Sequence, residues 1–463
     1  MESTSLNFEL TDSTFIQKPQ SRFDIIFKKR YIHSAMVAIG YAVVHINRYN
    51  LSLAIVSMTD KKSSNENFHE FNWNEREKGA LLSSFFWGYV LSQVAAGQIA
   101  QSISPKLLLT ITTSISALLA AVSPLASYIG GWQLLIAIRI TDGLCQGFFP
   151  PLIFKMASNW YPPCERSRLL GFALSGAAAS TGILSLFGAL AQSAGGWPSI
   201  FYVCALLTLL WTISWAWSAA DSPATHKTIS SEEKNYIETS LKNCVDFDKK
   251  MKTPWMKIFT SIPFWALIFT GMCDGFCRTL LLSEIPSLIN GIFKVKITAN
   301  GFLSEAPYYV MWLLVFPACW LADYLLKNRI LSKSAVRKLW TTLSMSASCL
   351  IMLLVGFFAN DIIPFMVILI IAIAFHAFLF SSYLITPLEL ASNFAGIIYA
   401  LTNTADNLSA ALAPIVTGMT VDNPNSMDQW WTVFLIMTCL SVTGNVIYLI
   451  FGSTDVQDWN SPE

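Results

Sequence analysis

Charged residues are scarce in this sequence. Asp, Glu, Lys and Arg make up 13% of the 463 residues, against about 25% in soluble proteins. Hydrophobic residues make up 54%, and the formal net charge of +1 leaves no excess of Lys and Arg for a nucleic-acid-binding face. The composition excludes an ordinary soluble protein and predicts a polytopic protein embedded in the lipid bilayer.

The usual marks of an enzyme are also missing. The sequence contains no Gly-rich phosphate loop, no metal-spaced cluster and no nucleophile with a base partner. Its nine cysteines are scattered, mostly inside apolar runs, and we interpret Cys273 and Cys277 as packing residues. No cleavable apolar core precedes Arg30, so we expect no removed signal peptide. We therefore expect neither an enzyme nor a resident cofactor or metal.

Apolar runs long enough to cross a bilayer recur along the chain. A run of about 20 residues spans the hydrocarbon core, and about twelve such runs are present. They lie near residues 31–58, 79–100, 107–128, 131–159, 167–192, 198–219, 262–289, 300–324, 337–358, 361–384, 394–418 and 430–452.

One long polar interruption divides these runs into two sets of six. It contains SSEEKNYIETSLKN from Ser230, whose capping serine, early acids and late lysine predict an amphipathic surface helix. The predicted units are an N-terminal tail (1–30), a six-helix half (31–220), a linker (221–257), a second six-helix half (258–452) and a C-terminal tail (453–463).

Basic residues indicate the orientation of these units. Lys and Arg crowd residues 22–30, 166–168, 234–257 and 327–338, which by the positive-inside rule places the linker and both termini in the cytosol. The loop 59–78 carries mixed charge and is placed outside by parity. The fold class is thus an all-α polytopic membrane protein of about twelve transmembrane helices in two six-helix halves, the major facilitator fold, with its site between the halves at mid-membrane.

The stretch RITDGLCQG from Arg139 places charge inside one of these runs. Arg139, Asp142 and Gln146 share one helical face, and Gly143 and Gly147 form a small-xxx-small pair that lets a neighbouring helix approach. Charge at such a depth costs roughly 2.5–3.5 kcal/mol per residue. It indicates either a substrate or gating role or a structural Arg139–Asp142 ion pair.

A second arginine lies at a similar depth. Arg48 is on the order of 27 Å from the cytosolic start of its segment, and Arg139 is roughly 10 Å below the outer surface. We expect the two to flank one anion site, because the guanidinium fork binds carboxylate or phosphate through two hydrogen bonds. The alternative pairs Arg48 with an acid elsewhere, namely Asp274, Asp406 or Glu305.

Further polar residues lie in the second half. Asp274 and Arg278 are four residues apart and could pair on one helix, for structural or functional reasons. Asn403 and Asp406 form a polar face at mid-depth. Asp406 could coordinate Na⁺ or carry a proton, or it could form an interhelical hydrogen bond.

The chain resembles the anion–cation symporters, the family of type I sodium–phosphate cotransporters, sialin and vesicular glutamate transporters. The resemblance covers nearly the whole chain after the N-terminal tail. Its motifs are RYNLSLAIV from Arg48, SFFWGY from Ser84, RITDGLCQG from Arg139, PPCERSR from Pro162, GWPSIFY from Gly196, KTPWMKIFTSIP from Lys252, LAD from Leu321, ILSKSAVRK from Ile330 and DVQDW from Asp455.

The resemblance implies transport of small anions by alternating access. It assigns the substrate arginines to Arg48 and Arg139. It also implies a cytosolic gate, formed by the charged loop residues Glu165, Arg166, Arg168, Asp323 and Arg337. Opposite charges between helices break and reform as the two halves rock.

Departures from the family pattern indicate the branch. Proton-coupled members carry a glutamate where this chain has Gln146, and some vesicular members carry a histidine where it has Leu82. In the seventh apolar run (262–289), Asp274 stands where the vesicular glutamate branch has an arginine, and Arg278 follows one turn later. These departures favour the type I branch, which is described as carrying phosphate with Na⁺ and organic anions such as urate.

We therefore expect a secondary active or potential-driven transporter of phosphate or organic anions. One alternative is a proton-coupled, sialin-like exporter of acidic sugars or amino acids, with Asp142 or Asp406 as the coupling group. The other is an anion channel or sensor. We expect the protein to be a monomer. Its expected partners are a small anion and the lipid bilayer, and no nucleic acid. The coupling ion is Na⁺ or H⁺, with Cl⁻ dependence as a further option. The plasma membrane is favoured over a lysosomal or vesicular membrane.

Overall fold

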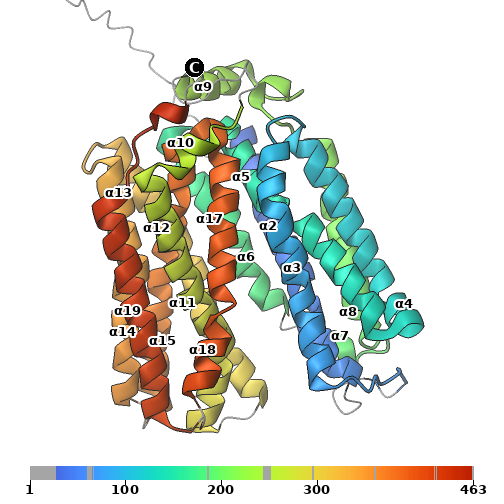
Figure 1. The fold of residues 1–463 in the computed structure, drawn as a ribbon. Helices are drawn as coiled ribbons and strands as arrows, with labels where there is room; N and C mark the ends of the chain where they lie inside the picture. Colours follow the sequence, from blue (N-terminus) through green and yellow to red (C-terminus); the bar gives the residue numbers. More distant parts are fainter. Residues whose placement is uncertain are drawn as a thin grey trace, which may run out of the picture.

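A computed structural model describes residues 28–59, 65, 67–184, 187–242, 252–294, 297–358, 361–421, 423 and 425–460. Residues 1–27 of the predicted tail, 243–251 of the predicted linker and 461–463 at the C-terminus lie outside the described residues. The described residues form helices and short 3₁₀ or π turns, without a strand, arranged as two bundles (Figure 1).

The first bundle contains the helices up to residue 218. They are α2 (Lys29–Thr59), α3 (Glu75–Ile99), α4 (Pro105–Gln146), α5 (Phe149–Trp160), the turn η2 (Pro163–Glu165), α6 (Arg166–Leu184), α7 (Phe187–Gln192) and α8 (Pro198–Ser218).

The second bundle follows the linker and is more often interrupted. Its elements are α11 (Ile262–Phe293), α12 (Ile297–Lys327), α13 (Lys333–Thr342), the π turn η4 (Leu343–Ala347), α14 (Ser348–Leu353), η5 (Leu354–Phe358), α15 (Ile362–Ala374), η6 (Phe375–Ser381), η7 (Tyr383–Ile385), α16 (Thr386–Leu390), η8 (Ser392–Phe394), α17 (Ala395–Ala410), α18 (Ala413–Thr420) and α19 (Met427–Phe451).

The helices account for about twelve membrane crossings. Eight described stretches are long and apolar enough to span, and one of them, Pro105–Trp160, has 56 residues, which is enough for two crossings. The remaining crossings are α2, the pair α6 and α7, and the pair α17 and α18, which are less apolar or broken. The predicted fold class is confirmed.

The third and fourth predicted segments are joined in α4. The helix is broken at Gly131, where φ is +58°, a left-handed conformation that glycine adopts without the steric cost of a side chain. The fourth segment then continues through α5. Hydropathy gives the length of an apolar run but does not distinguish an α-helix from a π or 3₁₀ turn. It therefore did not predict the π turn η4 inside the run 337–358 or the 3₁₀ turn η6 inside the run 361–384.

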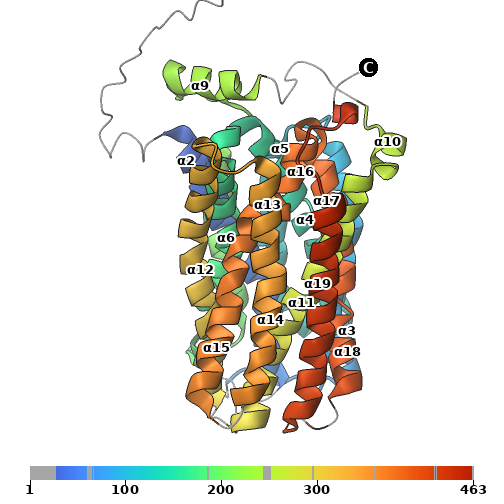
Figure 2. The same ribbon diagram turned by 90° about the vertical axis from the view of Figure 1, so that its left-hand side faces the viewer.

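Short helices lie at the end of the molecule that carries the last described C-terminal residues (Figures 1 and 2). The helix predicted from Ser230 is present as α9 (Ser231–Leu241), and the Ser230 side chain accepts a hydrogen bond from the backbone N–H of Glu233. The linker ends in α10 (Trp255–Phe259), and the chain ends near η9 (Asp458–Asn460). We call this the terminal end.

The two bundles meet through a few helices. α6 packs against α12, and α17 packs against α3 and α5. The bundles converge at the terminal end, and α3 and α18 separate toward the opposite end (Figure 1). The hydrophobic core of the first bundle also includes Ile385, Leu388 and Ala395 of the second bundle, so apolar as well as polar side chains join the two halves.

Candidate functional site

Arg139 lies at the centre of a hydrogen-bonded network between α2 and α4. Its side chain donates to the backbone oxygen of Arg48 at 2.6 Å and to Oδ1 of Asn50 at 3.3 Å. It forms an ion pair with Asp142 at 3.7 Å. The residue is only 4% exposed. Its two terminal nitrogens therefore serve the protein itself, whereas its Nε, like that of Arg48, has no hydrogen-bond partner among the described residues.

Asp142 and Gln146 complete this network. Asp142 accepts hydrogen bonds from the hydroxyl of Ser116 and, at 3.1 Å, from the Gln146 side-chain amide. Ser116 in turn accepts from the amide of Asn47 on α2 at 2.9 Å. The predicted polar face is present. It faces α2 and the part of α4 that precedes the break at Gly131, where Ser116 lies. This geometry favours the structural interpretation of the Arg139–Asp142 pair.

The glycines of the same stretch bring α3 close. A Cβ atom on Gly143 would collide with the backbone oxygen of Phe85, and one on Gly147 would meet the backbone oxygen of Tyr89. Gly88 of α3 makes the reciprocal approach to Ile140. The predicted close approach is therefore between α4 and α3, and it places SFFWGY beside the Arg139 stretch.

Arg48 has aromatic neighbours and no acidic partner among the described residues. Its guanidinium carbon lies 4.1 Å from the ring centre of Tyr89 and 5.3 Å from that of Phe85, and Arg139 lies 5.0 Å from the same Phe85 ring. The residue is half-buried, and its Nε has no hydrogen-bond partner. Within the described part of the chain, no salt bridge joins Arg48 to Asp274, Asp406 or Glu305.

Asn403, on α17 of the second bundle, forms hydrogen bonds with α3 beside Arg48. Its amide nitrogen donates to the hydroxyl of Tyr89 at 3.1 Å and to the side-chain oxygen of Gln93 at 2.9 Å. Tyr399, one turn earlier on α17, stacks on Phe154 of α5 with ring centres 3.6 Å apart. The surface around Arg48 is thus the surface where the two halves meet.

Arg278 is the second cation at this surface. It donates to both carboxylate oxygens of Asp406 at 3.0 and 2.8 Å and lies 3.6 Å from the carboxylate of Asp274. Asp274 also accepts from the hydroxyl of Tyr383 at 3.0 Å. The Arg278 side chain is 47% exposed, whereas Asp274 is buried. The Asp274–Arg278 pairing predicted along α11 is present, and Asp406 is a closer partner.

The two bundles place Arg48 and Arg278 around a common set of groups. Tyr89, which contacts Arg48, accepts from Asn403 of α17. Asp406, one turn further along α17, pairs with Arg278. His45 lies one turn before Arg48. Tyr41, one further turn back, has a buried hydroxyl without a hydrogen-bond partner. The sequence predicted that Arg48 and Arg139 flank one site, and both contact the Phe85 ring. It did not predict that Arg278 of the other half pairs with a helix that also contacts the neighbours of Arg48.

The charged loop residues gather at the terminal end. Glu165 forms ion pairs with Arg168 at 2.7 Å and with Arg30 at 2.6 Å, and Arg30 also pairs with Glu233 of α9 at 3.1 Å. Tyr236 of α9 donates to Glu165 at 3.5 Å, and burial together with Glu165 raises the pKa of Tyr236 to about 12, so it stays a donor. This cluster attaches α9 to the first bundle.

Asp323 joins the two halves. Its carboxylate accepts the backbone N–H groups of Ser167 at 3.2 Å and Arg168 at 2.9 Å, and the Arg168 guanidinium lies 3.9 Å away. Arg166 donates to the backbone oxygen of Leu388 at 3.1 Å, which is a second link across the interface. These contacts place three predicted gate residues between α6 and the second bundle.

Arg337 pairs with a residue that the sequence did not single out. Its fork binds Glu389 at 2.7 Å, and it also donates to Ser381 at 2.8 Å and to the hydroxyl of Ser167 at 3.0 Å. Glu389, in TPLEL between two apolar runs, carried a usable signal, because an acid so near the membrane needs a partner. Arg30 and Glu233 lie in polar stretches and carried none.

The sequence is similar to known membrane transporters over most of its length. The family model of the Major Facilitator Superfamily matches residues 37–414. The chain belongs to the Major Facilitator Superfamily. Vesicular glutamate transporter 3 of Danio rerio is 33% identical over 94% of this chain and 75% of its own length. A putative inorganic phosphate cotransporter of Drosophila melanogaster is 32% identical over 96% and 88%.

These relatives also confirm the predicted family of anion–cation symporters, and they are transporters, so the expectation of a protein other than an enzyme is confirmed. Identities of 32–33% do not separate the glutamate from the phosphate relatives. Among solved structures, the proton:xylose symporter XylE superposes with a TM-score of 0.69 at 12% identity, covering 92% of this chain and 97% of its own. That similarity concerns the fold alone.

Proposed function

We propose that this superfamily member transports small anions by alternating access, with Arg48 as the anchor for the anion. The observation that carries the proposal is the state of the Arg48 guanidinium. It is half-buried at the surface between the halves and has ring neighbours but no carboxylate partner in the described residues. A cation held in such surroundings is stabilised by an anion that arrives from solution.

Arg278 would provide the second contact from the other half. In its ion pair with Asp406 the Arg278 side chain is 47% exposed and the carboxylate is mostly buried, so an incoming carboxylate or phosphate could reach the fork and compete with Asp406. Such an exchange would make the Arg278–Asp406 pair sensitive to substrate, and it would leave Asp406 free to accept Na⁺ or a proton. The names of the relatives, which mention glutamate and inorganic phosphate, support an anion as the cargo.

The conformation supports the same proposal. With the termini in the cytosol, as the basic residues predict, the links of Asp323 and Arg166 close the cytosolic side, and the opposite side is where the bundles separate. This corresponds to a state in which the anion would enter from outside, or from the lumen of an organelle. Salt bridges that join two rocking halves at one end are suited to break when the other end closes.

The test is flux into proteoliposomes of the purified full-length chain. Labelled phosphate, urate, p-aminohippurate, sialate and glutamate would be offered with and without Na⁺, a pH gradient and a membrane potential. We expect saturable uptake of at least one anion. Arg48→Gln should reduce its kcat/KM by about a hundredfold, since a lost charge-assisted contact costs roughly 2–3 kcal/mol. Arg329→Gln, in an exposed turn, is the matched control and should transport normally.

The absence of saturable flux under every gradient would refute the proposal. Trans-stimulation by internal anion would separate a carrier from the channel alternative, because a channel conducts without counterflow. Uptake that depends on a pH gradient at fixed voltage would favour the proton-coupled, sialin-like alternative over a voltage-driven or Na⁺-driven carrier.

A further inference from the structure

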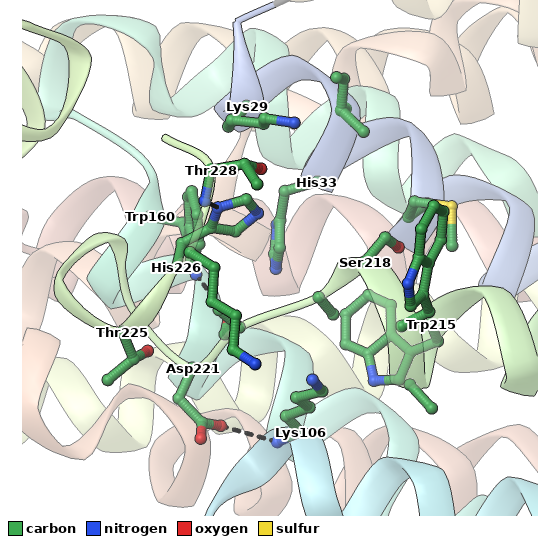
Figure 3. A pocket seen from close by; sticks show the side chains of 17 residues that line it. Lys29, His33, Lys106, Trp160, Trp215, Ser218, Asp221, Thr225, His226 and Thr228 are labelled. Carbon is green, nitrogen blue, oxygen red and sulfur yellow. Dashed lines mark hydrogen bonds between the residues drawn. The ribbon is translucent and has the colours of Figure 1, made fainter. Parts of the chain in front are cut away.

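A cavity of about 780 Å³ opens on the first bundle at the terminal end, away from the surface between the halves (Figure 3). Its walls come from the first turns of α2 and α4, the last turns of α5 and α8, and the segment that leads from α8 to α9. None of the residues assigned above to anion binding or gating lines it.

Positive charge dominates this cavity. Lys29, Lys106 and Lys227 line it, and in the described part of the chain none of their side chains forms a salt bridge. The one acidic lining residue, Asp221, is already engaged: it accepts from the hydroxyl of Ser104 at 2.5 Å and from the backbone N–H of Lys106 at 2.8 Å. The nearby Glu233 is held by Arg30. Among the described residues, the lysine side chains are therefore left without a salt-bridge partner.

Two buried side chains in the wall have unused polar atoms. His33 is 6% exposed; its Nδ1 contacts the hydroxyl of Tyr161 at 3.2 Å, and its Nε2 has no partner in the part of the chain that the structure describes. Trp215 is fully buried, and its Nε1 also has no partner. A buried polar atom without a partner costs about 1–3 kcal/mol. Both atoms belong to residues that line the cavity, so a ligand there could satisfy them.

His226 adds a neutral polar group at the rim. Its Nδ1 accepts the backbone N–H of Thr228 at 3.2 Å, which leaves Nε2 as the protonated nitrogen when the ring is neutral. Burial and the nearby Lys29 lower the pKa of His226, so the ring is neutral at pH 7. It edges against Trp160 at 5.7 Å, as His33 stacks on the same indole at 4.9 Å. The rim thus offers a directed N–H donor.

The remaining wall is apolar and reaches the membrane-facing side of the bundle. Ile32 and Met36 of α2 line it, together with Trp217 near the end of α8, which is 90% exposed. Tryptophan favours the interface between lipid and water, where its ring contacts acyl chains and its N–H contacts headgroups. A ligand in this cavity would therefore meet cationic and N–H donors at one end and an apolar surface beside it.

We propose that the cavity binds the headgroup of an anionic phospholipid carrying a phosphate monoester, with the three lysines holding the phosphate and the Trp217 side supporting an acyl chain. Basic pockets between transmembrane helices at the cytosolic face are the sites where such headgroups bind. Soluble phosphate carries the same charged group as the headgroup, but it has no acyl chain to contact the apolar wall.

The test measures lipid binding to the full-length protein by native mass spectrometry and by thermal stabilisation, and it requires no transport. The protein would be titrated with phosphatidic acid, phosphatidylcholine or inorganic phosphate. The variant is Lys29→Gln/Lys106→Gln/Lys227→Gln. The matched control, Lys252→Gln/Lys327→Gln/Lys333→Gln, removes three exposed lysines elsewhere.

We expect phosphatidic acid to bind the wild type and the control alike, and to bind the cavity variant about a hundredfold more weakly, since each of the three lysines near an anionic lipid contributes roughly 1 kcal/mol. Equal binding to the cavity variant and the control would overturn the proposal. So would inorganic phosphate that stabilises and competes as well as the lipid, since that would make this a soluble phosphate site. If the triple variant does not fold, Lys227→Gln alone, in the exposed connection, should weaken binding about fivefold.

Discussion

At the residue scale, the two conspicuous arginines have different surroundings. Arg139 is surrounded by acceptors from its own bundle, whereas Arg48 has rings and no carboxylate among the described residues. A guanidinium whose donors are used internally gains little from an added anion. A guanidinium without a carboxylate partner gains more from an added anion.

Arg139→Ala should therefore act first on stability. Removing it leaves the buried Asp142 without its cation, and breaking a buried pair costs about 3–5 kcal/mol. We expect a lower melting temperature in detergent together with reduced uptake in proteoliposomes. A variant that melts like the wild type and yet transports nothing would instead support direct contact between Arg139 and the anion, as the sequence predicted.

Gln146→Glu should add a pH dependence to transport. The Gln146 amide donates to Asp142 at 3.1 Å, so the substitution puts two carboxyl groups side by side, and such a pair shares one proton. At low pH the shared proton preserves the charge balance with Arg139. As the pH rises, the second negative charge would oppose anion binding, and uptake should fall.

The check is initial uptake rate against pH at fixed voltage. Gln133→Glu, an exposed position on the same helix, is the control and should leave the profile unchanged. An unaltered profile for Gln146→Glu would show that this position has no influence on coupling.

At the element scale, the packing of α4 against α3 depends on glycines, which have no side chain to keep the two backbones apart. Gly143 and Gly88 let the two backbones touch, and this contact brings Phe85 beneath both arginines. The residue chemistry at Arg48 therefore depends on the distance between two helices.

Gly143→Ala should destabilise the protein, although alanine is the better helix former. The new methyl group would overlap the backbone oxygen of Phe85, which cannot move as a side chain would. We expect a cost of about 1–3 kcal/mol, seen as a lower melting temperature. Gly79→Ala on α3 meets no atom within 4 Å and should be neutral or stabilising. Equal melting temperatures for the two variants would contradict this account.

At the scale of the whole molecule, a small set of charged contacts joins the two halves at the terminal end, in addition to the apolar packing between them. Asp323 accepts two backbone N–H groups of the opposite half, and Arg337 reaches Ser167 there while its charge is balanced by Glu389 within its own half. The equilibrium between the two openings of a carrier depends on how strong these contacts are.

Asp323→Asn should shift the molecule toward opening at the terminal end. The amide keeps one acceptor and loses the charge, which weakens hydrogen bonds worth roughly 1.5–3 kcal/mol. Cys319 lies one turn away on α12, is 2% exposed and faces Gly171 of the other half. We expect its labelling by a thiol reagent, located by peptide mass spectrometry, to become about tenfold faster.

Asp428→Asn, exposed in the first turn of α19, is the control for this variant and should label at the wild-type rate. Unchanged labelling of Cys319 in Asp323→Asn would show that this carboxylate does not hold the halves together.

The sequence alone determined the class, the number of crossings and the family, because bilayer thickness sets the length of an apolar run and the motifs are local in the chain. It also identified Arg48, Arg139, Arg278 and Asp406, since charge inside such a run is conspicuous by itself. Only the tertiary structure decided which charges meet. Arg278 with Asp406, Arg337 with Glu389 and Arg30 with Glu233 are 128, 52 and 203 positions apart. Helix packing decides which of these residues meet in space, and their separation in the sequence does not reveal it.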